Sequence, residues 1–237
     1  MSSQGSSAVV KMQTKRKTNY KGASNKQEVT LTPKNENQAL YMKALNESAQ
    51  VITVGPAGTG KTYVVATHAA NRYTTKQIDK IIITRPHVAV GKELGFLKGD
   101  IEDKTLPWAM PVLDVLSQHL GKGAVDTGIK NGNIEVAPMA LMRGRSFDNA
   151  YIIIDEAQNI TIPELKMVVT RVGENCTLVL NGDIKQSDIK EQSGLSKAIH
   201  LAKKYSMDAP VIEFTTDDIV RSDICKQWII AFDKEGL

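Results

Sequence analysis

Five short apolar runs recur along the chain, and longer segments separate them. The runs are VITV (51–54), IIIT (81–84), YIII (151–154), TLVL (177–180) and VIEF (211–214). Continuous apolar runs of this length indicate strands buried on both faces, and the intervening segments carry apolar residues at helical spacing. The pattern therefore predicts an α/β fold, with a mostly parallel sheet and helices on both of its faces.

An amphipathic helix is expected just before the first run, in LTPKNENQALYMKALN (31–46). Thr32 is a plausible N-cap, and Pro33 has the fixed φ that suits the first helical position. The apolar residues that follow at helical spacing are Ala39, Leu40, Ala44 and Leu45. A capped helix is thus predicted directly upstream of the first strand.

The first strand is followed by GPAGTGKT (55–62), which matches the pattern G-x-x-x-x-G-K-[ST]. The motif lies between the strand at 51–54 and a predicted helix at 61–72, which is the context that a phosphate-binding loop requires. Backbone N–H groups of such a loop can surround a β-phosphate, Lys61 can reach the β- and γ-oxygens, and the Thr62 hydroxyl can ligate Mg²⁺. We therefore expect a site for ATP and Mg²⁺.

A pair of carboxylates follows the strand at 151–154, in YIIIDEAQN. Asp155 at the strand end is expected to hold a metal-bound water, and Glu156 to orient and deprotonate an attacking water. The alternative is that both carboxylates lie solvated on a surface loop. Because a carboxylate beside the metal ligand favours water as the phosphoryl acceptor, hydrolysis is the favoured reaction.

The next strand ends in NGDIKQSD (181–188). Since parallel strands converge on a ligand at their carboxyl ends, Gln186 is placed to detect the γ-phosphate. The alternative is that Asn-Gly-Asp forms an ordinary turn with no ligand.

Several motifs in order resemble known families. GPAGTGKT, DEAQN and GDIKQ resemble motifs I, II and III of superfamily 1 helicases, and Gln38 resembles the glutamine with which those enzymes recognise adenine. Closer still, IIITRP, GKELGFLKGD, APMALMRGRSFDNAYIIIDEAQN, TRVG and DIVRSD resemble the PhoH family of P-loop ATPases over residues 30–235. The resemblance implies a RecA-like ATPase linked to RNA metabolism, in the bare ATPase form of many phage-encoded members, without an accessory nuclease or RNA-binding domain.

The motifs and the resemblance together define an expected site. Expected catalytic residues are Lys61, Glu156, Gln186 and Arg221, and expected metal ligands are Thr62 and Asp155. Expected nucleotide-binding residues are Gln38, Gly55, Pro56, Ala57, Gly58, Thr59, Gly60, Lys61, Thr62 and Tyr63.

The positive charge of the chain is concentrated at its start. Residues 1–30 hold six lysine or arginine residues and one glutamate, so that they carry +5 of a net +4 and leave the rest at −1. This stretch has no apolar periodicity, and we expect a flexible basic arm at 1–30 ahead of an ATPase domain at 31–237. The arm either seeks nucleic-acid phosphates or serves as a solubilising leader.

The segment after the second strand is also of interest. Arg85, in the strand-end sequence Thr84-Arg85-Pro86, either contacts a phosphate or pairs with a neighbouring carboxylate. The segment 85–106 contains Gly91, Gly95 and Gly99 and is long enough for a binding loop. Trp108, beside a helix start expected near Pro111, either stacks on a base or packs on the core.

Three classes of function remain open. The favoured one is a Mg²⁺-dependent ATP hydrolase that acts on single-stranded nucleic acid, RNA in preference to DNA, as a helicase or remodelling enzyme. The others are a nucleotide-gated protein-interaction module with slow hydrolysis and, less favoured, a small-molecule phosphotransferase. The chain lacks an apolar run long enough to span a membrane, so we expect a cytoplasmic protein in a bacterial cell or phage-infected host.

The chain has one phosphate-binding loop, whereas superfamily 1 helicases combine two RecA-like halves. We therefore expect a homo-oligomeric ring, hexameric by analogy, in which a neighbouring subunit supplies an arginine finger. Arg221 in DIVRSD is the first candidate, followed by Arg143, Arg145 and Arg171. The alternative is that each arginine pairs with a nearby acidic residue.

Overall fold

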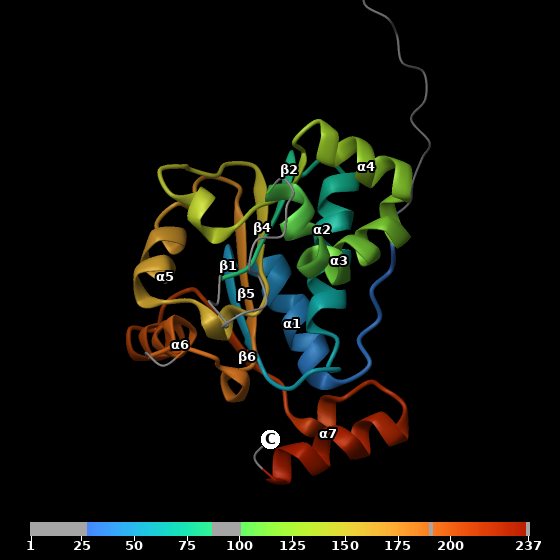
Figure 1. The fold of residues 1–237 in the computed structure, drawn as a ribbon, viewed down its shortest axis with the longest axis vertical. Helices are drawn as coiled ribbons and strands as arrows, with labels where there is room; N and C mark the ends of the chain where they lie inside the picture. Colours follow the sequence, from blue (N-terminus) through green and yellow to red (C-terminus); the bar gives the residue numbers. More distant parts are fainter. Residues whose placement is uncertain (1–27, 87–100, 190–191, 236–237) are drawn as a thin grey trace, which may run out of the picture.

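The computed structural model describes residues 28–86, 101–189 and 192–235. Its centre is a single sheet with the order β3-β2-β4-β5-β1-β6, in which every neighbouring pair is parallel (Figure 1). The strands are β1 (Gln50–Val54), β2 (Lys80–Thr84), β3 (Ile134–Val136), β4 (Ala150–Ile154), β5 (Thr177–Gly182) and β6 (Val211–Glu213). The α/β fold with a parallel sheet is as predicted.

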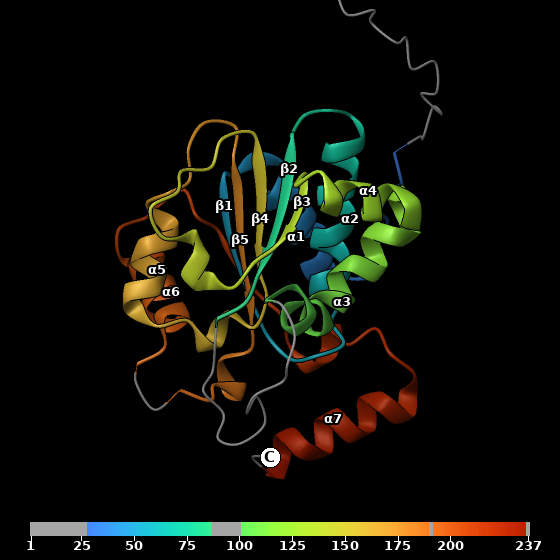
Figure 2. The ribbon, with the colours of Figure 1, turned by 45° about the horizontal axis from the view of Figure 1, so that its top comes forward.

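Helices cover both faces of this sheet (Figure 2). One face carries α1 (Glu36–Glu47), α2 (Lys61–Thr74), α3 (Ile101–Leu120) and α4 (Lys122–Lys130), and the other carries α5 (Ile162–Val169) and α6 (Gly194–Lys204). Alternate residues of one strand enter opposite cores: Ile81 and Ile83 pack on the α1–α4 side, and Ile82 packs on the α5–α6 side. This two-sided burial is why the strands appear in the sequence as unbroken apolar runs.

The five predicted strands are all present, but the sequence pattern missed β3. This edge strand has only three residues, with the charged Glu135 between Ile134 and Val136. It pairs with β2 through Ile81 to Ile83. A short edge strand with one polar position does not produce the apolar run on which the prediction depended.

Two predicted helix starts are wrong. The N-cap of α1 is Asn35, whose side-chain oxygen accepts a hydrogen bond from the Gln38 N–H at 2.8 Å, so Thr32 and Pro33 lie outside the helix. Pro107 and Pro111 lie inside α3 and do not mark its start. Trp108 is half-buried against the α1–α4 core, as the packing alternative proposed. Most of the expected binding loop, residues 87–100, lies outside the described residues, as does nearly all of the basic arm.

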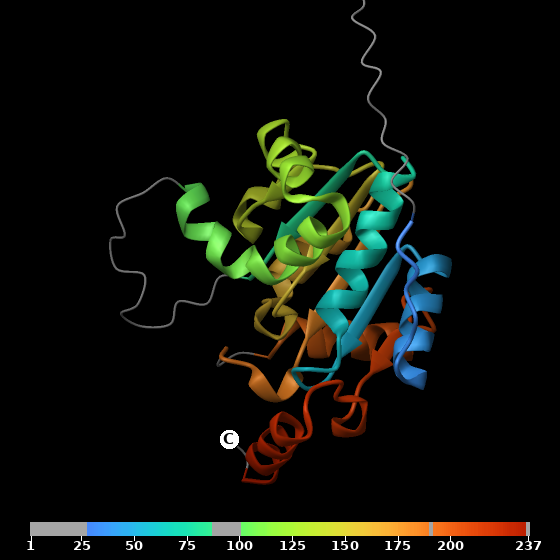
Figure 3. The ribbon, with the colours of Figure 1, turned by 90° about the vertical axis from the view of Figure 1, so that its right-hand side faces the viewer.

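The last helix, α7 (Asp223–Glu235), extends beyond the end of the sheet (Figures 1 and 3). None of its described side chains is buried. Ile224, Trp228 and Phe232, spaced four residues apart, are 60%, 59% and 48% exposed, and the Trp228 and Phe232 rings stack with centroids 5.6 Å apart. We call these three residues the α7 stripe. Among the described residues, no helix, α7 included, is long and apolar enough to span a membrane.

Candidate nucleotide site

The loop between β1 and α2, residues 55–60, depends on three glycines. Gly55, Gly58 and Gly60 have φ of +137°, +82° and +87°, values that residues with a Cβ rarely adopt. The first is also sterically confined, because a Cβ on Gly55 would lie 2.3 Å from the Phe214 carbonyl oxygen. Gly60 is the N-cap of α2 and offers no capping side chain, so the first N–H groups of the helix are available to an anion.

Lys61 is folded back onto this loop. Its Nζ donates hydrogen bonds to the carbonyl oxygens of Gly55 at 2.6 Å and Pro56 at 2.8 Å. Burial lowers the pKa of Lys61 below its ordinary value. The carboxylates of Asp183, Asp155 and Glu156 oppose this shift but do not cancel it. The ammonium group is thus surrounded by carboxylates and loop carbonyls, which are the kind of oxygen ligands that phosphate oxygens would replace.

One pocket brings most of the expected site residues together at the carboxyl ends of β1, β4 and β5. It is lined by the expected residues Gly55, Ala57, Gly58, Thr59, Gly60, Lys61, Thr62, Tyr63, Asp155, Glu156, Gln186 and Arg221, together with Pro111, Gln158, Gly182 and Asp183. Of the expected residues, Pro56 contributes its carbonyl to Lys61, and Gln38 lies behind the loop. Convergence at strand ends is the ordinary location of ligands in parallel sheets.

Asp155 is half-buried directly after β4. Burial and the neighbouring Glu156 raise its pKa to about 6, while the Glu156 backbone N–H, Arg85 and Lys61 oppose the rise. Arg85 favours the ionised form of Asp155 electrostatically, but the two form no ion pair among the described residues, so both alternatives for this arginine stay open. The Asp155 carboxylate and the Thr62 hydroxyl line the same pocket and are hard oxygen donors that suit Mg²⁺. A bound cation would favour the ionised form of Asp155.

Glu156 has an unusual backbone for a residue with a long side chain. Its φ of 53° and ψ of 39° place it in the left-handed region, at a cost of the order of 1 kcal/mol or more. The Gln158 side-chain amide donates to its Oε2 at 2.6 Å. This conformation turns the Glu156 side chain into the pocket beside Lys61 and the phosphate-binding loop.

Gln158 was not assigned a role from the sequence, although it belongs to the DEAQN motif. The residue is 1% exposed, and its Oε1 accepts a hydrogen bond from the Asp183 N–H at 3.0 Å. One carboxamide thus joins the end of β4 to the end of β5, where Asp183 and the exposed Gln186 line the pocket. The Gln-to-backbone contact over 25 residues has no signature in the local sequence.

Gln38 does not line the pocket with the other expected residues. Its side chain is 4% exposed, its Nε2 donates to the Thr59 carbonyl oxygen at 2.9 Å, and its Oε1 accepts from the Lys34 N–H at 2.9 Å. Both ends of the carboxamide are therefore engaged by the protein behind the phosphate-binding loop.

Arg221 lies in the pocket of its own chain, whereas we expected it to reach the site of a neighbouring subunit. A Cβ on Gly58 would lie 2.9 Å from the Arg221 Cγ, and the Val220 N–H donates to the Gly58 carbonyl oxygen at 2.9 Å. Arg145 forms two hydrogen bonds with Glu135 and is held away from any finger role. Arg221 reaches the pocket of its own chain because the segment after β6 returns to the phosphate-binding loop before α7 begins.

Comparison with known proteins agrees with this geometry. The model of a family described as "PhoH-like protein" matches residues 30–233. Protein PhoH of Escherichia coli K12 is 41% identical over 203 residues, 84% of this chain and 57% of that protein. A PhoH-like protein of Bacillus subtilis is 37% identical over 236 residues, 96% of this chain and 74% of that protein.

Solved structures also show similarity, at lower levels. The Pif1 helicase from Candida albicans matches with a TM-score of 0.46 and 15% identity over 87% of this chain and 44% of that chain. The SWI2/SNF2 ATPase core of Sulfolobus solfataricus, in complex with dsDNA, matches with a TM-score of 0.45 and 14% identity over 81% of this chain and 46% of that chain. The family match covers most of the chain, and the chain belongs to the PhoH-like family of P-loop ATPases.

Proposed function

We propose that this chain hydrolyses ATP with Mg²⁺ and that single-stranded nucleic acid, RNA in preference to DNA, stimulates the reaction. The observation that carries the proposal is the convergence of Lys61, Asp155 and Glu156 in one pocket behind a glycine-rich loop. A phosphate-binding lysine and loop would suffice for binding. The additional carboxylate beside the metal candidate favours water as the acceptor.

Each residue has a distinct part in this proposal. Lys61 leaves the loop carbonyls and binds the β- and γ-phosphates with the N–H groups at the start of α2. Thr62 and Asp155 would hold Mg²⁺, which supplies positive charge against the phosphate oxygens. Glu156 orients the attacking water and accepts its proton, and Gln158 keeps the Glu156 carboxylate in place. Gln186 contacts the γ-phosphate, and Arg221 adds positive charge from the same chain.

An ATPase assay with and without single-stranded RNA and DNA, over a salt series, tests this function. We expect magnesium-dependent release of phosphate that rises with RNA, and a stimulation that declines as salt competes for the nucleic-acid phosphates. Removal of residues 1–27 should weaken the stimulation and flatten its salt dependence. Hydrolysis that is indifferent to both nucleic acids would instead favour a nucleotide-gated protein-interaction module.

The α7 stripe supports a proposal of self-assembly. The partner proposed is a second copy of this chain, because the chain itself has an apolar groove near the amino ends of β1 and β5, at the end of the sheet away from α7. Its apolar lining includes Leu165 and Val169 of α5, Leu201 of α6, and Met207. A stripe at one end and a groove at the other make a head-to-tail contact, which closes into a ring if the rotation allows, a hexamer by analogy.

Light scattering over a range of protein concentrations tests the assembly. A mass that rises above one chain, and that Trp228→Ser abolishes, is the expected result. A single-chain mass at every concentration would contradict it, without bearing on hydrolysis. We also propose a cytoplasmic location. The chain spans little more than half of the Escherichia coli protein, so the activity of that whole protein is not transferred to it.

A further inference from the structure

Recognition of adenine by a glutamine requires a carboxamide with a free donor and a free acceptor facing the ligand. The Gln38 carboxamide does not line the pocket, and both of its ends face groups of the protein in this structure. Its Oε1 accepts from the Lys34 N–H and its Nε2 donates to the Thr59 carbonyl oxygen, each at 2.9 Å, and only 4% of the residue is exposed. Turning this amide towards a base would break two hydrogen bonds of buried or half-buried groups.

The carboxamide is packed directly against the phosphate-binding loop. A Cβ on Gly60 would lie 2.7 Å from the Gln38 Nε2, so the glycine allows the amide to approach the backbone this closely. Gly60 also has a φ of +87° and precedes the first residue of α2. Gln38 therefore contacts the loop where its N–H groups begin to point at a phosphate.

The position of this hydrogen bond determines what it can do. In a planar trans peptide the C=O of one residue and the N–H of the next point in opposite directions. A bond from Gln38 that fixes the Thr59 carbonyl behind the loop therefore directs the Gly60 N–H the other way. The Val220 N–H holds the Gly58 carbonyl in a similar manner at 2.9 Å, which directs the Thr59 N–H.

These two restraints are joined to each other. The side-chain amides of Asn35 and Asn37, on the same helix start as Gln38, donate to the Asp218 carbonyl and carboxylate oxygens at 3.1 and 2.8 Å. Asp218 is buried and precedes Val220 by two residues. The start of α1 and the segment before α7 thus hold two consecutive loop carbonyls as one connected unit.

We propose that Gln38 is a positioning residue for the phosphates and does not select the base. This inference rests on the proposed nucleotide site. The base is left to Tyr63, which lines the pocket and is 45% exposed. Stacking on an aromatic ring tolerates every base, so the chain should bind ATP and GTP with similar affinity.

Tripolyphosphate separates the two roles because it has the phosphates and no base. The experiment measures binding of MgATP, MgGTP and magnesium tripolyphosphate by calorimetry to the full chain and to Gln38→Ala. Positioning predicts that all three ligands bind about 10-fold more weakly to the variant, and that the ratio of ATP to GTP affinity is unchanged. Lys43→Gln, an exposed substitution on the same helix, is the control and should alter none of them.

Other outcomes overturn the proposal. A variant that binds tripolyphosphate as the parent does while its ATP to GTP ratio shifts would identify Gln38 as a base-recognition residue. A shifted ratio together with weakened tripolyphosphate would also contradict it, as would three unchanged affinities. If Gln38→Ala does not fold, Gln38→Met keeps the volume and removes both hydrogen bonds. A parent that binds these ligands without hydrolysing ATP would defeat the proposed function and leave the result for Gln38 intact.

Discussion

The phosphate-binding loop and the α7 stripe lie at the same end of the molecule (Figures 1 and 3) and differ in how they are held. Around the loop, side chains from distant segments fix individual backbone groups: Gln38 holds Thr59, and Gln158 holds Glu156 and Asp183. In α7, none of the described side chains is buried, although the helix begins two residues after Arg221. The loop is thus fixed by contacts within one chain, whereas α7 leaves exposed the apolar stripe that we propose a second copy covers.

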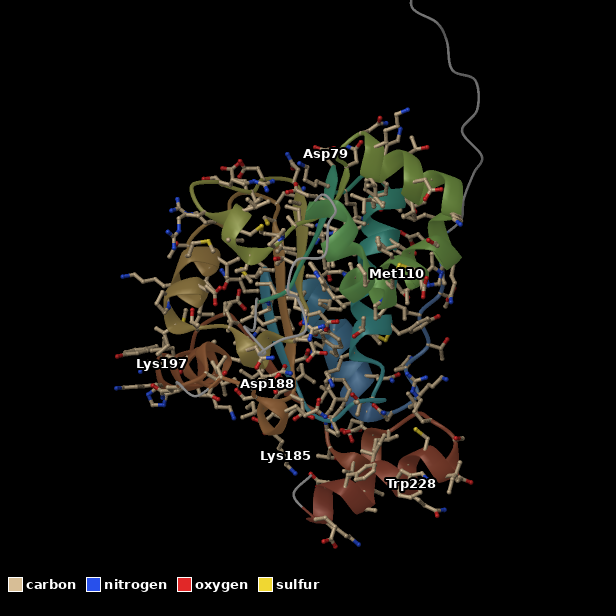
Figure 4. All side chains as sticks on the ribbon, viewed as in Figure 1. Asp79, Met110, Lys185, Asp188, Lys197 and Trp228 are labelled. Atoms are coloured by element: carbon tan, nitrogen blue, oxygen red, sulfur yellow. The ribbon has the colours of Figure 1, made fainter. Side chains whose placement is uncertain are left out.

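The few contacts that do hold α7 are of a weaker kind. Lys185 pairs with Asp233, and the Lys226 ammonium donates to the Asp217 carbonyl at 3.3 Å. Figure 4 shows Lys185 on the turn that faces α7 and Trp228 on the helix itself. Exposed pairs of this kind contribute little to stability. The following predictions test the contrast, in order of decreasing effect.

The largest effect is expected where the loop is most confined. Gly55→Ala combines a φ of +137° with a Cβ that would lie 2.3 Å from a carbonyl oxygen, so we expect a loss of about 4 kcal/mol in the free energy of unfolding, from strain and overpacking together. Denaturant unfolding measures it. The control is Gly123→Ala on α4, where a Cβ meets nothing within 4 Å and a small gain is expected. Equal effects in the two variants would show that the loop is not rigid.

The next effect concerns turnover. Glu156→Gln removes the proposed base but keeps an oxygen that can accept the hydrogen bond from Gln158. We expect ATP binding to persist and the turnover number to fall about 100-fold or more. The measurement is steady-state phosphate release beside equilibrium ATP binding, with the exposed Glu174→Gln as control. A turnover number close to that of the parent would remove Glu156 from the mechanism.

A smaller effect follows from the pKa of Asp155. The fold raises this pKa from 3.8 to about 6, so it favours the protonated form. The contribution to stability is complete below about pH 4 and is lost as pH rises through about 6, by about 3 kcal/mol. Asp155→Asn should therefore raise the melting temperature of the nucleotide-free protein at pH 7 and abolish magnesium-dependent hydrolysis.

Thermal unfolding at pH 4 and pH 7 tests this sign. The gain from Asp155→Asn should be present at pH 7 and small at pH 4, and the exposed Asp126→Asn should show no such change. An equal gain at both pH values would mean that ionisation of Asp155 does not destabilise the folded protein.

The smallest effect is expected in α7. Trp228→Ala removes a side chain from a residue that is 59% exposed, so the free energy of unfolding of the single chain should change by no more than about 0.5 kcal/mol. Trp108→Ala, at the other tryptophan, removes a ring that packs on the core and should cost about 3 kcal/mol. Comparable losses would place the α7 stripe in the core of a single chain.

Local patterns in the sequence were sufficient for every strand except β3, for the phosphate-binding loop, and for the positions of Asp155 and Glu156 at the end of β4. Each of these depends on residues within one strand and the turn after it. Thr32 was predicted as the N-cap of the first helix, but the cap is Asn35. Both are good capping residues, and Asn35 also contacts Asp218, 183 residues away, which no local pattern reveals. The positions of Gln38, Gln158 and Arg221 depend on contacts between segments that only the folded chain brings together.

The strand order has a consequence for how the protein is made. The loop follows β1, yet β1 lies between β5 and β6 and pairs with Val211 to Glu213, about 160 residues later in the chain. During synthesis the first half of the chain can form α1 and α2, but the strand that carries the loop gains its neighbours only when the last quarter has emerged. Long-range parallel pairing is slow and leaves strand edges exposed meanwhile. The nucleotide site is therefore among the last parts of the protein to be assembled, although its signature stands near the beginning of the sequence.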